Sequence, residues 1–208
     1  MTEAMAVTVF GATGRIGGHV LAEGVRRGHR ITAFTRRPDS LTDTDTLAAV
    51  VHGDGRDPDA VARAVAGADA VIAIVGAGSR KGPHHTADVA RVIIDAMTQA
   101  RVRRLVTTSA YPIVAERPRI PVAILRRVLA ASYADNAEME RLVAASGLDW
   151  TVARLNRLLD RPAQGSVRLS TGQLAKPKSM TRADAAATLL DLAEADTYAR
   201  SAVNVCGP

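Results

Sequence analysis

The feature that most constrains this chain is a glycine turn near its start, between an apolar run and an amphipathic segment. Residues 5–10 read MAVTVF and residues 11–18 read GATGRIGG, with Gly11, Gly14 and Gly17 three positions apart. A buried parallel strand that ends in such a turn reaches the edge of a sheet. Glycine lets the backbone approach a pyrophosphate, and the next helix presents free N–H groups to the phosphates. We therefore predict a dinucleotide-binding βα unit; the alternative is a tight turn without a ligand.

The rest of the chain alternates between apolar runs and helical patterns. Strands that alternate with helices are joined by right-handed crossovers into a doubly wound parallel sheet. We predict an α/β fold, a single Rossmann-type domain over 1–208 with a mostly parallel sheet, in which residues 155–208 form a small substrate-side cap. The expected strands lie at 5–10, 31–35, 49–52, 70–75, 105–109, 149–154, 167–171 and 202–205, and the expected helices at 16–27, 58–66, 86–100, 122–131, 135–145 and 181–195.

Composition and hydropathy exclude several classes of protein. Of the 208 residues, 47% are hydrophobic and 23% are charged, as in ordinary globular domains. No apolar run approaches the ~18 residues of a membrane span and no secretory pattern opens the chain, so we expect a cytoplasmic protein. The single cysteine, Cys206, excludes an internal disulfide framework and a cysteine-based metal site, and we expect no metal.

The basic balance of the chain raises the question of nucleic-acid binding. The formal net charge is +6, but the arginines are scattered in pairs along the sequence and aromatic residues make up only 3%. Such a chain has no stacking platform for single strands, and no helix-turn-helix or zinc-finger pattern is present. We expect a basic surface with local anion sites, a small-molecule substrate, no nucleic-acid or membrane partner, and a monomer or homodimer.

The residues after the second expected strand indicate which dinucleotide is bound. In this fold an acidic residue at that point binds the ribose 2′-OH and selects NAD. Here Arg36 and Arg37 follow the strand, and a guanidinium can bind a 2′-phosphate through two hydrogen bonds. We therefore predict NADP(H), with Arg36 as the first contact and Arg37 as the second. The alternative is that both arginines face solvent.

Two further segments are placed to meet the cofactor. Asp54, after the third strand, could accept a hydrogen bond from the adenine amino group, or it could serve only the turn Gly53-Asp54-Gly55. Val75, Gly76 and Ala77 end the fourth strand, where they should run under the cofactor at the topological switch point.

These motifs resemble a known family. GATGRIGG at 11–18, Arg36 after the second strand, Gly-Asp at 53–54, Val-Gly at 75–76 and Thr-Ser-Ala at 108–110 are similar to the atypical short-chain dehydrogenase/reductases. The chain most resembles their NAD(P)H-binding, NmrA-like branch, which includes the flavin reductase biliverdin reductase B. Segment 138–152, EMERLVAASGLDWTV, is similar to the late helix–strand step of that branch.

The resemblance implies roles for residues at matching positions. The implied pyrophosphate-binding residues are Gly11, Thr13, Gly14, Arg15 and Ile16. Arg36 would bind the 2′-phosphate and Asp54 would lie on the adenine side. Gly76 and Ala77 would lie near the ribose, and Ser109 beside the nicotinamide.

One departure from the wider family concerns proton transfer. Most short-chain dehydrogenases use Tyr-x-x-x-Lys, in which the lysine lowers the tyrosine pKa. At the expected positions this chain has Ser132 and Asn136, while Tyr111 and Tyr133 each have alanine four residues later. The absence of this pair argues against alcohol–ketone interconversion by that route and agrees with the flavin-reductase branch.

The predicted function is that of an NADPH-dependent oxidoreductase that transfers hydride to a planar acceptor such as a flavin or quinone. Such an acceptor takes hydride with little help when it lies face to face with the nicotinamide. Ser109 is the candidate catalytic residue, or an ordinary strand-end hydroxyl. Tyr111 and Arg157 could contact substrate, or serve only the loop and the surface.

Two other functions remain open. One is a non-catalytic NADP(H)-sensing regulatory protein of NmrA-like type, which would bind a partner protein. The other is an isomerase or epimerase, for which the missing acid/base pair is unfavourable.

Overall fold

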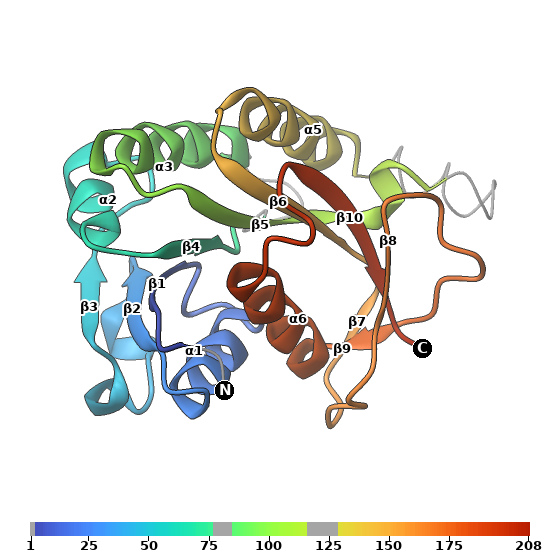
Figure 1. Ribbon diagram of the computed structural model, residues 1–208, viewed down its shortest axis with the longest axis horizontal. Helices are drawn as coiled ribbons and strands as arrows, with labels where there is room; N and C mark the ends of the chain where they lie inside the picture. The colour runs from blue at the N-terminus through green and yellow to red at the C-terminus, as the bar shows by residue number, and fades with distance from the viewer. Residues whose placement is uncertain (1–2, 77–84, 116–128) are drawn as a thin grey trace.

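The computed structural model describes residues 3–76, 85–115 and 129–208, and its centre is an eight-stranded sheet (Figure 1). The strand order is β3-β2-β1-β4-β5-β6-β10-β8, and every neighbouring pair is parallel except β8 with β10. These strands are β1 (Ala6–Phe10), β2 (Arg30–Thr35), β3 (Ala49–His52), β4 (Ala70–Ala73), β5 (Arg104–Ala110), β6 (Asp149–Leu155), β8 (Arg168–Ser170) and β10 (Ser201–Cys206).

Helices cover both faces of the sheet, as expected for a doubly wound α/β domain. On one face lie α1 (Gly17–Arg26) and α6 (Arg182–Glu194), and on the other α2 (Pro58–Val65), α3 (Thr86–Ala100) and α5 (Ala130–Ala145). Short 3-10 turns are η1 (Pro38–Ser40), η2 (Thr44–Thr46) and η3 (Tyr111–Ile113). The predicted fold class is confirmed. The helix expected at 122–131 lies mostly outside the described residues. No helix in the described ranges is long and apolar enough to cross a membrane.

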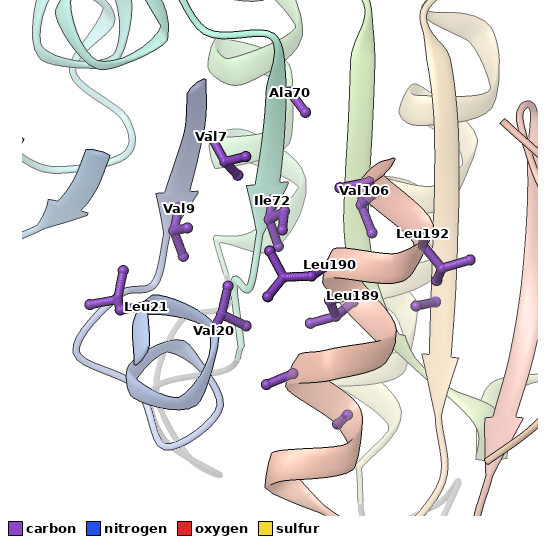
Figure 2. Packing of buried hydrophobic residues seen from close by; sticks show 14 of the residues in the cluster. Val7, Val9, Val20, Leu21, Ala70, Ile72, Val106, Leu189, Leu190 and Leu192 are labelled. Atoms are coloured by element: carbon purple, nitrogen blue, oxygen red, sulfur yellow. The ribbon is translucent and has the colours of Figure 1, made fainter. Parts of the chain in front are cut away.

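The central strands are apolar because both of their faces are buried. Val7 and Val9 of β1 pack toward α1 and α6, whereas Phe10 belongs to the core beneath α2 and α3. Figure 2 shows Leu189 and Leu190 of α6 lying against the strands. Parallel pairing then brings the carboxyl ends of β1, β2, β4 and β5 to one edge of the sheet, with the glycine turn at the β1–β4 switch point.

The C-terminal region is more deeply integrated than the expected cap over 155–208. Helix α6 packs in the main core beside α1, and β10 pairs with β6 in the main sheet. The smaller part outside these layers includes a two-stranded sheet of β7 (Leu158–Leu159) and β9 (Met180–Thr181). The sequence predicts the helix, but only the structure shows that α6 is buried on most of its surface within the main core.

A buried arginine closes the end of α6. The guanidinium of Arg104, a residue only 7% exposed, donates hydrogen bonds to the carbonyl oxygens of Asp149, Leu192 and Ala195 and to Thr151 Oγ1. Burial lowers the pKa of Arg104 from its ordinary value. Because the last carbonyls of a helix lack partners within it, this guanidinium satisfies acceptors that would otherwise be buried alone.

Arg104→Met should therefore lower the free energy of unfolding by about 2 kcal/mol, since it leaves those carbonyls without a donor. Urea unfolding followed by circular dichroism measures the change. The matched control is Arg103→Met: Arg103 is exposed and pairs with Asp149 at the surface, so the expected change is within about 0.5 kcal/mol. Equal unfolding midpoints for the two variants would contradict this role of Arg104.

Candidate functional site

The glycine turn is held by close backbone approaches. Gly11 has φ +80°, and a Cβ there would lie 2.2 Å from the carbonyl oxygen of Ile74, just after β4. A Cβ at Gly17 would lie 2.2 Å from the carbonyl oxygen of Gly11. Gly14 donates its backbone N–H to the same carbonyl at 2.9 Å. The turn is therefore compact because two of its glycines have no room for a side chain.

The N-terminus of α1 is free to meet an anion. It has no side-chain cap and no acidic residue in its first turn. By contrast, Asp57 caps α2, Thr181 caps α6, and the carboxylate of Asp135 accepts from the first N–H groups of α3. The Gly18 N–H donates to the Gly14 carbonyl oxygen at 3.0 Å, but no side chain caps the helix, so its positive dipole end fits the pyrophosphate of a dinucleotide.

The predicted 2′-phosphate residues lie at the carboxyl end of β2. Arg36 and Arg37 are both exposed, and neither guanidinium pairs with a described residue. Thr35 ends the strand beside the glycine turn, with its Oγ1 3.2 Å from Thr13 Oγ1, and it accepts from the backbone N–H of Arg37 at 3.0 Å. The two arginines therefore lie near the turn, and neither guanidinium group is paired with a described residue.

Asp54 is already engaged by a residue that the sequence reasoning missed. Arg56 donates to Asp54 from Nε at 3.0 Å and Nη2 at 3.1 Å, and from its backbone N–H at 2.9 Å. These hydrogen bonds, with a smaller contribution from Arg36, lower the pKa of Asp54 to about 2. The turn role proposed for Asp54 is therefore realised, and an adenine amino group would share a carboxylate that already holds a cation.

A cavity of about 320 Å³ lies at the same edge of the sheet, beyond the switch point. Ser109, at the end of β5, is 8% exposed, and its Oγ is buried with no hydrogen-bond partner among the described residues. A buried hydroxyl without a partner is costly, so it indicates a place for a ligand atom. The described lining consists of Ile16, Val75, Gly76, Thr108, Ser109, Ala110, Asn136, Leu155, Asn156, Leu158 and Arg182.

Some of the predicted site residues line the cavity, and others do not. Ile16, Val75, Gly76 and Ser109 line it together, while Ala77 lies outside the described residues. Tyr111 is buried elsewhere: its hydroxyl lies 3.1 Å from Gln173 Oε1 and accepts from the Leu174 N–H at 3.1 Å. Its hydroxyl therefore ties two loops together.

Arg154 within β6 and Arg157 after it are not among the residues that line the cavity. Arg157 is exposed. Arg154 is held by Glu140, with its Nη2 2.5 Å from Oε2.

The cavity also contains residues that sequence reasoning did not select. Asn136 is the residue at which the resemblance implied the family's lysine, so that departure could have pointed to it. Arg182 lies at the start of α6, where Thr181 Oγ1 accepts from the Asp184 N–H at 3.0 Å, and no sequence pattern gave a reason to place it in a site. Its place in the cavity depends on the pairing of β7 with β9, which no local pattern indicates.

Metal binding has no support among the described residues, where no three His, Cys, Asp or Glu side chains form a group suited to an ion.

A doubly wound sheet that has a glycine turn and an uncapped helix N-terminus at its switch point defines a Rossmann-type nucleotide-binding protein. The chain belongs to the NAD(P)H-binding family, whose sequence profile matches residues 11–196. The resemblance to the atypical short-chain dehydrogenase/reductases and the expected NAD(P)H cofactor are thereby confirmed.

Individual relatives share most of the chain. YhfK of Bacillus subtilis, named as an uncharacterised sugar epimerase, is 29% identical over 171 residues, which cover 78% of this chain and 77% of that protein. A short-chain dehydrogenase/reductase from Veillonella parvula, solved in complex with NADP, has a TM-score of 0.83 at 20% identity and covers 99% and 96% of the two chains. ChuY, an anaerobillin reductase from Escherichia coli, has a TM-score of 0.79 at 23% identity and covers 98% and 97%. At these identities the solved structures establish a common fold.

Proposed function

We propose that this protein is an NADPH-dependent reductase that transfers hydride to a planar acceptor such as a flavin or quinone. The observation that carries the proposal is the buried, unpartnered Ser109 hydroxyl in a cavity that continues from the glycine turn through Ile16 and Gly76. A Rossmann-type site places the reactive end of its cofactor at this edge of the sheet.

The residues that would hold the cofactor follow the order of the sheet. The glycine turn and the first N–H groups of α1 would bind the pyrophosphate, because they are uncapped. Arg36, with Arg37 beside it, would bind the 2′-phosphate. Gly76 and Ile16 would lie against the nicotinamide half, since both line the cavity that contains Ser109.

NADPH, when bound, supplies the hydride. The Ser109 hydroxyl would donate its proton in a hydrogen bond to the acceptor or to the carboxamide, orienting one ring over the other. Ile16, Val75 and Leu155 would provide apolar contacts for a flat ring system. Solvent would deliver the proton that completes reduction of a flavin or quinone.

The described lining supports a planar acceptor over chemistry that needs an acid and a base. It includes no Asp, Glu, His, Lys, Tyr or Cys side chain, and the lining residue Asn136 is where the resemblance implies the family's lysine. Epimerisation and alcohol oxidation both require proton transfer at a defined atom. The NADP complex of the Veillonella protein and the reductase activity named for ChuY support the same proposal.

The direct test is rapid mixing of NADPH-loaded protein with FMN, riboflavin and quinones, followed by the absorbance of the reduced nicotinamide. A reductase gives acceptor-dependent loss of absorbance over repeated turnovers. Absence of turnover with every acceptor would contradict the proposal. If the protein then also distinguished NADP⁺ from NADPH in equilibrium binding, the NmrA-like regulatory function would be supported instead.

Ser109→Ala should lower kcat/KM for the acceptor by about three- to tenfold, which corresponds to one hydrogen bond of ordinary strength. Ser132→Ala is the matched control, because Ser132 does not line the cavity although it stands at the family's tyrosine position. Steady-state kinetics at saturating NADPH measure both. Equal activities of the two variants would remove Ser109 from the proposed mechanism.

A further inference from the structure

The cavity beside Ser109 has a charge that the proposed hydride transfer does not use. Arg182, the first residue of α6, is the charged side chain in its described lining, and that side chain is only 12% exposed. A largely desolvated guanidinium is costly unless an anion accompanies it. Whether Arg182 can bind a ligand depends on how firmly its present ion-pair partner is held.

The partner of Arg182 is shared and open to solvent. Asp160 Oδ1 lies 2.5 Å from Arg182 Nη1, while Asp160 Oδ2 lies 3.1 Å from Arg15 Nη1. The Asp160 side chain is 62% exposed. One carboxylate therefore serves two guanidinium groups, which leaves an excess positive charge, and solvent around the exposed Asp160 screens its attraction to Arg182. The remaining donors of Arg182 make no hydrogen bond with a described residue.

The ion pair of Arg154 with Glu140 is an example of an arginine that has a counter-ion of its own. Arg154 and Glu140 are 19% and 13% exposed, and three contacts of 2.5 to 3.1 Å join them. That arginine has a buried carboxylate of its own, and it does not line the cavity. Arg182 differs because its counter-ion stands in solvent and can be exchanged.

We propose that Arg182 binds an acidic group of the acceptor, a carboxylate, sulfonate or phosphate, and thereby selects anionic planar acceptors over neutral ones. The inference rests on the proposed reductase function. Arg182 shares its part of the cavity with Leu155, Asn156 and Leu158 of the β6–β7 segment. Asp160 also pairs with Arg15 of the glycine turn, so NADPH affinity must be measured beside acceptor affinity to separate an acceptor anion from a cofactor phosphate.

FMN and riboflavin make a matched pair of probes, because they differ only by a phosphate. Binding of each to NADP⁺-saturated protein, where no turnover occurs, is measured by flavin fluorescence. We expect FMN to bind ten- to a hundredfold more tightly than riboflavin, as for one charge-assisted contact. Arg182→Gln should abolish this preference and leave riboflavin and NADPH affinities within about twofold. A second pair, 1,2-naphthoquinone and its 4-sulfonate, repeats the comparison on another ring system.

Two further variants separate recognition from general structure. Asp160→Asn should raise FMN affinity about threefold or more, because it removes the competing carboxylate. Arg161→Gln removes the same charge from an exposed neighbour and should preserve the preference. A merely structural arginine would not give opposite effects for the two members of its ion pair.

Each result of these binding and turnover measurements either supports or contradicts the inference. No preference for the acidic member of either pair, or equal losses for both members in Arg182→Gln, overturns the inference. A parallel loss of NADPH affinity does so too, since the bound anion would then be the cofactor's. Preference in binding without turnover would support the anion site and contradict the reductase function. Turnover without preference would do the reverse.

Discussion

Gly11→Ala is expected to lower the free energy of unfolding by more than about 3 kcal/mol and to weaken NADPH binding strongly. Gly11 has φ +80°, where an L-residue is strained, and its Cβ would lie 2.2 Å from the Ile74 carbonyl oxygen. The oxygen belongs to the backbone and the position of the Cβ is fixed by the backbone, so no side-chain rotation relieves the clash. The turn after β1 or the end of β4 must move, and both border the cofactor site.

The control for this prediction lies in the same motif. A Cβ at Gly18 would meet nothing within 4 Å, and the residue lies in the first turn of α1. Gly18→Ala should therefore leave stability unchanged or raise it by about 0.5–1 kcal/mol through helix propensity. Urea unfolding and NADPH titration of both variants make the comparison. A Gly11→Ala protein that unfolds at the wild-type urea concentration would contradict the role given to the turn.

Arg36→Ala is expected to weaken NADPH binding by about ten- to a hundredfold and to leave NADH binding little changed. The two cofactors differ in the 2′-phosphate, and Arg36 lies at the end of β2 with an uncommitted guanidinium. Arg36 is close enough to Asp54 to help lower the pKa of that carboxyl, but Arg56 makes the hydrogen bonds to it. Arg36 is therefore free to bind an anion.

Fluorescence titration with each cofactor checks this selectivity, and the affinity loss should shrink as salt screens the exposed charge. Arg30→Ala is the matched control, because Arg30 is also exposed but opens β2 at the opposite edge of the sheet. The Arg30→Ala variant should bind NADPH and NADH with unchanged affinity. Equal losses of NADPH and NADH affinity in Arg36→Ala would show that the arginine does not contact the 2′-phosphate.

Local patterns predicted the order of the described elements well. The strands at 49–52 and 149–154 and the helix at 86–100 were expected within a residue of their observed ends. The helix at 86–100 was readable because its apolar residues recur at helical spacing, whereas β3, an edge strand without a buried residue, was readable from its short apolar run. The same patterns placed β10 correctly but assigned it to a cap, since a short apolar strand does not specify its neighbour.

The candidate site was predictable only where it depends on one segment. The glycine turn and Arg36 each follow a strand and Ser109 lies at the end of one, so strand position alone brings them to one edge of the sheet. Tyr111 also follows β5, but its hydroxyl is taken by Gln173 and Leu174 from a distant loop. Periodicity along a chain contains no information about such a partner.

The sequence by itself determined the dinucleotide-binding class of this protein, because a strand, a turn without side chains and a helix form the phosphate site within one short segment. Only the tertiary structure decided which side chains meet beside Ser109. Arg182 reaches that cavity through the pairing of β7 with β9, while Arg157, for which the sequence left substrate contact and a surface position both open, is exposed. Which way a side chain points depends on the packing of segments far apart in the chain, and that packing sets the contacts available to an acceptor.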